Sequence, residues 1–429
     1  MSVRRVGAMF AVSISIVLIA VATLTPGATN GGSAAHWQFT VGATPLTDAC
    51  SNVLLFVPLG AALASLGWRV RVAASVGVLL SVVIEVLQSA GHPVGRYATY
   101  ADLIANSVGA IGGALVVNAR LRWLHPNARN AQRLAYGWSA MVVLLVMVTS
   151  WLLSPIHPYG ADASLPTLSR LENAPGYPWF SGTVLHATLS GVELVHHGTG
   201  PVRVTAPTAA REAVVNVISR DDRLSFVPVL YVHDARDTVP YLLLGQLGDD
   251  AVLRSPRHGD ALGLRMPQLV VRGAFASGPM ASGPVASGGV AATDRAQREL
   301  VVAVTPARLT MRLAGADSLP RVRPERLDLT ASLGWLMTQP VVGDDATSRT
   351  WGTAAWLLLL VAPAWFWVGR SGDRRARTSI VVLGGIAGVF LLTPPIFGVA
   401  WLPIWQWNVL VFGATAGALG SRWPHPANS

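Results

Sequence analysis

The sequence predicts an all-α membrane protein of about eight transmembrane helices with an inserted, extracytoplasmic all-β sandwich domain. Of the 429 residues, 52% are hydrophobic and only 13% are charged, whereas a soluble domain carries roughly 25% charged residues. Several apolar runs reach the roughly 17–25 residues that a helix needs to cross a bilayer. These runs stop at residue 153 and resume near residue 351, and short segments typical of strands fill the interval.

The distribution of charge predicts the orientation and the partners of the chain. The net charge of +10 comes from arginine alone, and outside the predicted β-domain the arginines cluster beside the apolar runs. This is the positive-inside pattern, so we expect the lipid bilayer as a partner and no nucleic acid. The single cysteine, Cys50, excludes an internal disulfide and a cysteine-built metal site. We expect no metal and no cofactor.

Five apolar runs form the predicted first domain, residues 1–153. They cover about 8–24, 52–67, 70–89, 103–117 and 134–153. Arg4 and Arg5 before the first run fit a cleavable signal peptide as well as a retained helix. We expect a retained helix, because the run is long and further spanning segments follow. Cytoplasmic arginines at 4–5, 69–71 and 120–133 then give one consistent topology with a cytoplasmic amino terminus.

Residues 154–349 are predicted to form the extracytoplasmic β-sandwich. Gly, Pro, Asp and Asn separate short β-branched or alternating segments, which is typical of an antiparallel sandwich. The 18 arginines and 18 acidic residues of this segment balance each other. A low-complexity Ala-Ser-Gly stretch at 274–291 is predicted to be a loop. The expected strands cover 183–189, 213–218, 227–233, 241–247, 268–271, 300–305 and 309–313.

Residues 350–429 are predicted to form a carboxyl-terminal transmembrane region. Its three apolar runs cover about 351–368, 379–399 and 405–419. Arginines lie between the first two runs, at 370–377, and after the last run, at 422. Both clusters are expected inside, so the chain is predicted to be a multi-pass plasma-membrane protein with both termini cytoplasmic.

Seven polar residues are predicted to meet at the outer face of the second, third and fourth helices. Outside the β-domain the chain has only four acidic residues, and three of them lie at outer helix ends. The one arginine predicted on the outer side is in the same stretch. Within each helix the members are three or four residues apart and therefore share a face. The set consists of Asp48, Asn52, Glu85, Gln88, Arg96, Asp102 and Asn106.

These seven residues are the candidate functional site. A carboxylate near hydrocarbon costs at least ~2.5 kcal/mol on insertion scales unless it is paired or hydrogen-bonded. Carboxylates that meet suit general acid–base work, so Glu85, Asp102 and Asp48 are the candidate catalytic residues. The alternative is that polar residues at helix ends only cap the helix or meet headgroup water. The candidate substrate-binding residues are Arg96, as a clamp for a phosphate or carboxylate, and Gln88, Asn52 and Asn106.

The spacing of these residues resembles that of a known family. The pattern Asp48-x3-Asn52-x3-Phe56-x-Pro58-Leu59-Gly60, then Glu85-x2-Gln88, Arg96 and Asp102-x3-Asn106-x2-Gly109-x3-Gly113, is similar to the VanZ-like membrane protein family over about residues 8–120. The founding member of that family is associated with resistance to glycopeptide antibiotics of the teicoplanin type. The resemblance therefore implies a cell-envelope role, and a cell-wall or lipid-linked glycan is the partner we expect. Family members are often little more than the four-helix unit.

The β-domain resembles a concanavalin A-like or laminin G-like sandwich, a fold that often binds glycans. The stretch 213–253 carries this resemblance. Trp179, Tyr231 and Tyr241 could stack on a sugar, although core packing is the commoner role of such residues. Asp249 and Asp250 could bind calcium, but a solvated turn is favoured because the ligand spacing of a calcium site is missing.

Three functions compete at this point. The first is an envelope protein that uses the outer polar cluster to bind or process an envelope component, with a glycan-binding outer domain. The second is a non-enzymatic, membrane-anchored glycan-binding or scaffold protein. The third, a transporter, is disfavoured because no acid or arginine lies near the predicted middle of a helix. Whether the chain is an enzyme stays open.

Overall fold

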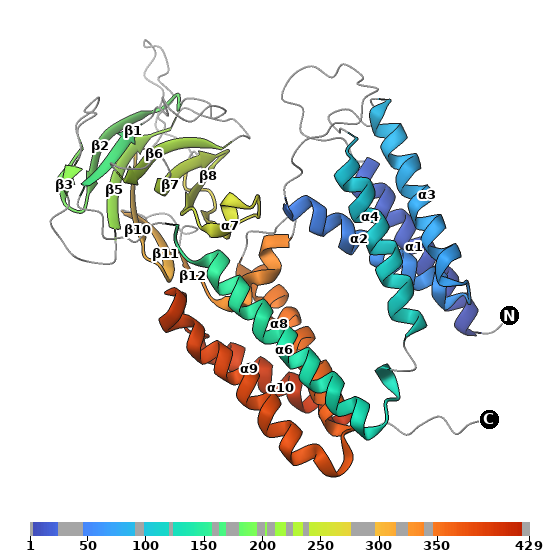
Figure 1. Cartoon of the computed structure of the whole chain (residues 1–429). Helices are drawn as coiled ribbons and strands as arrows, with labels where there is room; N and C mark the ends of the chain where they lie inside the picture. Colours follow the sequence, from blue (N-terminus) through green and yellow to red (C-terminus); the bar gives the residue numbers. More distant parts are fainter. Residues whose placement is uncertain are drawn as a thin grey trace, which may run out of the picture.

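The chain folds into two helix bundles and a β-region with two sheets (Figure 1). The computed structural model describes residues 3–24, 46–90, 98–119, 123–156, 163–168, 180–194, 202–203, 211–219, 226–234, 240–275, 297–314, 325–338 and 346–422.

The first bundle contains α1 (Val3–Leu24), α2 (Leu46–Ser65), α3 (Val70–Ser89) and α4 (Tyr100–Asn118). Helices α2 and α4 approach each other most closely. A methyl group on any of three glycines would overlap a backbone carbonyl oxygen of the facing helix, so only glycine permits this approach. These glycines are Gly60, Gly109 and Gly113.

The second bundle contains α6 (Ala128–Leu153), α8 (Ala346–Gly369), α9 (Arg375–Phe397) and α10 (Ile404–Gly420). Helix α6 packs against α8 and α9, and α10 packs against α8. One contact is the bond from the indole Nε1 of Trp138 to the carbonyl oxygen of Leu360, at 2.8 Å. The sequence predicts a first domain of five helices that includes this one, whereas the contacts of α6 join it to the carboxyl-terminal helices.

Seven helices in the described part of the chain are long and apolar enough to cross a membrane: α1, α2, α3, α4, α6, α8 and α9. Their length and composition agree with a membrane protein. Helix α10 is also apolar but has 17 residues. That it forms an eighth span stays a prediction, as does the side of the membrane on which each helix end lies.

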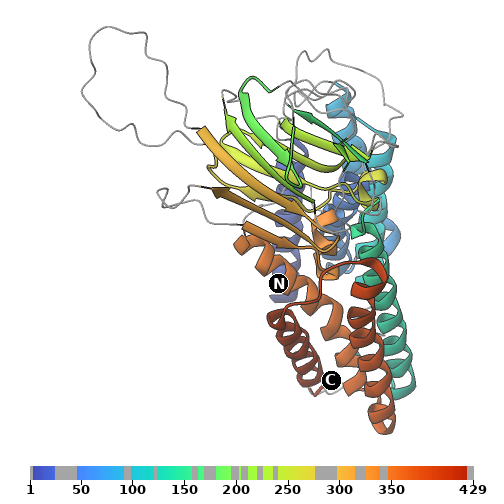
Figure 2. The ribbon, with the colours of Figure 1, turned by 90° about the vertical axis from the view of Figure 1, so that its left-hand side faces the viewer.

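The β-region consists of two six-stranded antiparallel sheets, in the orders β4-β1-β6-β7-β8-β9 and β12-β11-β10-β5-β2-β3. Figure 2 shows the strands above the second bundle. The strands are β1 (Ala163–Leu168), β2 (Thr183–Leu189), β3 (Val192–Glu193), β4 (Val202–Arg203), β5 (Arg211–Ile218), β6 (Val227–Asp234), β7 (Pro240–Leu247), β8 (Asp250–Arg254), β9 (Leu269–Val271), β10 (Gln297–Val304), β11 (Arg308–Ala314) and β12 (Glu325–Asp328).

The main hydrophobic core includes buried side chains from both sheets, so the sheets form a sandwich-like pair. Leu230, Leu244 and Leu253 come from the first sheet, and Val215 and Val302 come from the second; all five are fully buried. Alternating residues of β5 and β10 point into this core, as the period of two requires. In β6, next to a bulge, the adjacent Val229 and Leu230 both belong to the core. These strands therefore supply the core of the β-region.

Strand β8 begins at Asp250, one of the two residues considered for calcium. The Asp250 carboxylate pairs with Arg272 Nη1 at 2.7 Å and accepts the N–H of Gly273 at 2.8 Å. These protein groups give the carboxylate an ion pair and a backbone donor. Asp249 lies in the turn before β8, as the solvated-turn interpretation expected.

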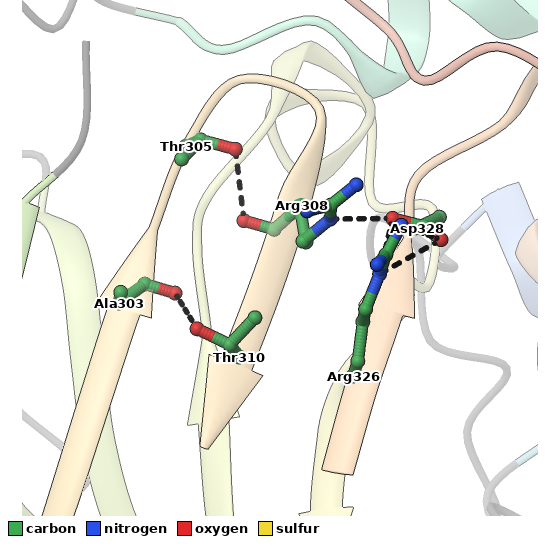
Figure 3. Close-up of polar contacts among 6 residues, drawn as sticks. All are labelled: Ala303, Thr305, Arg308, Thr310, Arg326 and Asp328. Carbon is green, nitrogen blue, oxygen red and sulfur yellow. Dashed lines mark hydrogen bonds and ion pairs between the residues drawn. The ribbon is translucent and has the colours of Figure 1, made fainter.

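The opposite sheet ends in a charge cluster at β11 and β12 (Figure 3). Asp328 Oδ1 accepts a hydrogen bond from Arg308 Nε at 2.6 Å, and its carboxylate also accepts two from Arg326 Nε, each at 3.0 Å. Partial burial alone would raise the pKa of Asp328. The hydrogen bonds from Arg326 and Arg308 outweigh that effect, so the pKa lies below its ordinary value.

A buried arginine joins the β-region to the second bundle. Arg257 is 1% exposed and lies just before the short helix α7 (His258–Ala261). Its guanidinium donates to the carbonyl of Leu153 at the end of α6, at 3.3 Å. It also donates to the carbonyls of Pro306 (2.8 Å) and Thr305 (3.2 Å) in the turn between β10 and β11. The cation therefore lies at the carboxyl end of α6, where the helix dipole favours positive charge.

The 3-10 helix η2 (Ala331–Thr338) contacts both bundles. Toward the first bundle, the Thr47 hydroxyl at the start of α2 donates to the carbonyl of Met337 at 2.7 Å and accepts the N–H of Arg265 at 2.8 Å. Toward the second bundle, the Ser332 hydroxyl donates to Gln406 Oε1 at 2.8 Å. The β-region is thus fixed to the amino-terminal end of α2 and to the second bundle.

Candidate functional site

The amino-terminal ends of α2 and α4 are joined by a side-chain hydrogen bond. Asn52 Nδ2 donates to Asp102 Oδ1 at 2.6 Å, and both side chains are half-buried. The backbone N–H of Asp102 donates to Thr99 Oγ1 at 3.0 Å, so Thr99 caps α4. A carboxylate in the first turn of a helix also interacts favourably with the helix dipole.

The carboxylate of Glu85 comes from the last turns of α3 and is 1% exposed. Its Oε2 accepts the backbone N–H of Thr99 at 2.9 Å. Thr99 therefore contacts Glu85 through its amide and Asp102 through its hydroxyl. The sequence predicts both carboxylates at one end of the bundle, and in the structure both residues bond to Thr99.

Deeper in the bundle lies a second polar pair. Asn106 is 2% exposed and Ser81 is fully buried, and Asn106 Nδ2 donates to Ser81 Oγ at 2.9 Å. Among the described residues, Asn106 Oδ1 has no hydrogen-bond partner. A buried acceptor without a donor costs roughly 1–3 kcal/mol. This oxygen is therefore suited to receive a hydrogen bond from a bound group.

The remaining predicted residues lie apart from these two pairs or outside the description. Gln88 Nε2 donates to the carbonyl of Thr23 at 3.3 Å, so Gln88 contacts the end of α1. Asp48 is exposed in the first turn of α2, one turn before Asn52. Arg96 lies outside the described residues, and its contact with Glu85 stays a prediction.

Residues 9–122 match the family model described as VanZ/LLP1. The first bundle is VanZ-like. The match begins in α1, ends just after α4, and includes every member of the polar cluster. It supports the family resemblance of the first bundle, and it does not extend into the β-region. No curated protein and no solved structure matches the chain.

Two further residues, Thr99 and Ser81, bond to the polar cluster and were not predicted from the sequence. Thr99 precedes Asp102 by three positions, which is the spacing of a helix cap followed by an acid, and this spacing was available in the sequence. Ser81 precedes Glu85 by one turn on the same face of α3, but a lone serine in an apolar helix carries no signal. Both supply bonds that hold the predicted residues in place.

The aromatic candidates of the β-region divide in three ways. Tyr241 is 9% exposed and belongs to the core between the sheets, so it packs as the commoner interpretation expected. Tyr231 is half-buried, with its ring centroid 5.3 Å from that of His233. Trp179 lies outside the described residues. In the described part of the chain, His, Cys, Asp and Glu form no group of three that could hold a metal ion.

Proposed function

We propose that this chain is a multi-pass plasma-membrane protein with a cell-envelope role, in which the polar cluster of the VanZ-like bundle binds or processes an envelope component. Of its seven predicted residues, Asn52, Glu85, Asp102 and Asn106 form hydrogen bonds there with one another, with Thr99 or with Ser81. The observation that carries the proposal is that residues from α2, α3 and α4 meet there through hydrogen bonds.

The chemistry of the cluster favours a ligand rich in hydrogen-bond donors. Two carboxylates and the oxygen of Asn106 are acceptors, and the hydroxyl groups of a sugar are donors of matching kind. Glu85 and Asp102 are the candidate acid and base, with Asp48 at the exposed rim. Arg96 would bind a phosphate or carboxylate of the same ligand. A lipid-linked or cell-wall glycan carries both kinds of group.

The β-region takes a second role in this proposal. We assign it to the outer side of the membrane, where it holds a glycan next to the VanZ-like bundle. The contact of Thr47 with Met337 and Arg265 supports this arrangement, because Thr47 lies about one turn of α2 before Asn52. The half-buried Tyr231 is the candidate stacking residue on the sheet.

The test uses a strain that lacks the gene and expresses a variant in its place. Glu85→Gln and Asp102→Asn remove a charge but keep the shape of the side chain. We expect both variants to lose the wild-type response to a glycopeptide antibiotic of the teicoplanin type, with unchanged protein level in the membrane. Asp373→Asn is the matched control, because Asp373 is an exposed acid at the far end of the second bundle. A wild-type response from both cluster variants would refute the proposal.

The second candidate function is a non-enzymatic, membrane-anchored glycan-binding or scaffold protein. It is favoured by the same hydrogen bonds, because Asn52 with Asp102 and Asn106 with Ser81 also lock the helices together. Thermal unfolding of the purified variants separates the two functions. If the protein is a scaffold, Glu85→Gln lowers both the unfolding temperature and the protein level. If the polar cluster is a functional site, Glu85→Gln removes the antibiotic response while the unfolding temperature stays near that of the wild type.

A further inference from the structure

The second bundle contains a cavity of about 420 Å³ between α8, α9 and α10. Helices α9 and α10 both pack on α8. Near the connection between α9 and α10, Phe390 of α9 contacts Trp407 of α10, with ring centroids 6.4 Å apart. The cavity is therefore a groove bounded by α8, and most of its lining side chains are apolar.

The groove is open to the surroundings of the bundle. Leu383, Val411 and Leu419 line it and are 56%, 65% and 56% exposed. In a membrane these surfaces face lipid chains. The lining of α10 extends from Trp407 to Leu419, which is about 18 Å of helix. Half of the hydrocarbon core of a bilayer is about 15 Å thick, so the groove matches the length of one lipid chain.

One end of the groove is positively charged. Arg422 lines the groove directly after α10, and Arg375 and Arg377 are exposed in the first turn of α9. Arg370 follows α8, and its guanidinium lies 5.0 Å from the ring centroid of Phe366. From residue 346 onward the only acidic residue is Asp373. Arginine clusters between membrane helices attract anionic head groups.

We propose that this groove binds an anionic phospholipid, with one acyl chain along α10 and the phosphate at Arg422. The long apolar lining fits the acyl chain of the lipid, and the arginines fit the negative charge of its head group. A neutral or zwitterionic lipid would satisfy the first feature but not the second. This site lies in the second bundle and is separate from the polar cluster of the VanZ-like bundle.

The test is native mass spectrometry of the purified full-length chain with added phosphatidylglycerol or phosphatidylcholine of the same acyl chains. We expect the wild type to retain one phosphatidylglycerol in preference to phosphatidylcholine. Arg422→Gln should weaken retention of phosphatidylglycerol about fivefold, the effect of one arginine at a charged lipid surface. Arg71→Gln is the control, because Arg71 is an exposed arginine of the first bundle.

A second pair of variants tests the groove itself. Ala414 lines the groove, so Ala414→Phe fills it and should abolish retention of the lipid. Ala416 is exposed on the same helix outside the lining, so Ala416→Phe should retain the lipid as the wild type does. Equal retention by these two variants, or equal retention of the two lipids, overturns the proposal. A dimer that Ala414→Phe converts to a monomer also overturns it, because a second copy of the chain would then occupy the groove.

Discussion

At the residue scale, Asp328 shows how paired charges hold the edge of a sheet (Figure 3). Its carboxylate is bonded to two arginines, Arg308 on β11 and Arg326 on β12. The hydrogen bonds lower the pKa of Asp328 below its ordinary value of 3.8 despite partial burial. A carboxylate with a lowered pKa in the folded state stabilises the fold above its unfolded pKa, and this contribution is lost as the pH falls through the folded pKa.

We therefore predict that Asp328→Asn lowers the free energy of unfolding by about 1 kcal/mol at pH 7, the upper range for partly exposed ion pairs. The difference from the wild type should shrink as the pH falls below about 4, where the wild-type carboxylate takes up its proton. Thermal unfolding of the full-length wild type and variant from pH 7 to pH 3 measures this difference in stability. Asp249→Asn, an exposed turn residue, should show no such change. A constant difference across this range would contradict the prediction.

At the same scale, the polar cluster marks the limit of inference from sequence. Asn52 and Asp102 could be predicted to meet, because charge is rare in this part of the chain and each residue shares a helix face with a polar neighbour. The cap spacing of Thr99 to Asp102 was available in the sequence but did not indicate the contact of Thr99 with Glu85, and Ser81 could not be ranked above the many other serines. Their importance comes from three-dimensional contacts, which spacing alone does not reveal.

At the element scale, the packing of α2 against α4 depends on glycine. Helix α4 offers a matched pair, because a methyl group on Gly109 would overlap the carbonyl oxygen of Val53, whereas one on Gly112 would meet nothing within 4 Å. We predict that Gly109→Ala destabilises the bundle by about 1–3 kcal/mol, the usual cost of overpacking. Gly112→Ala should be neutral or slightly stabilising, since alanine favours helix.

Thermal unfolding of the two purified variants, together with their levels in the membrane, checks this prediction. Loss of stability confined to Gly109→Ala would confirm that the helices touch at that glycine. Equal stability of the two variants would show that Gly109 does not lie against the carbonyl oxygen of Val53.

The elements themselves could be predicted unevenly. Helix α3 and strand β2 have the predicted bounds, because an uninterrupted apolar run and a β-branched alternation are strong local patterns. Strand β8 was missed, because it begins at Asp250 directly after a turn. The partners of α6 could not be predicted either, since an apolar helix does not encode which helix it packs against.

At the scale of the whole molecule, the arginines indicate the orientation. They lie in the turn between α2 and α3, at the start of α6, between α8 and α9, and after α10. The β-region contacts the opposite ends of α2, α6, α8 and α10. From the positive-inside rule we therefore predict that the β-region lies outside the cytoplasm.

Labelling of single cysteines tests this orientation. With Cys50→Ala as background, Leu262→Cys introduces a thiol at an exposed residue of the β-region, and Ala376→Cys introduces one at the start of α9. We predict that a membrane-impermeant maleimide labels Leu262→Cys on intact cells and labels Ala376→Cys only after permeabilisation. The reverse pattern would place the β-region in the cytoplasm.

The attachment of the β-region to the helices has a mechanical consequence. Arg257 and η2 bind it at several points, so it cannot swing on a flexible tether between the two bundles. Under the function we propose, a glycan bound by the β-region is therefore held at a fixed height above the lipid surface and in a fixed orientation relative to α2. Binding would then depend on the distance of the recognised group from the membrane as well as on its chemistry. A ligand whose recognised group lies much nearer to or farther from the membrane would not be bound.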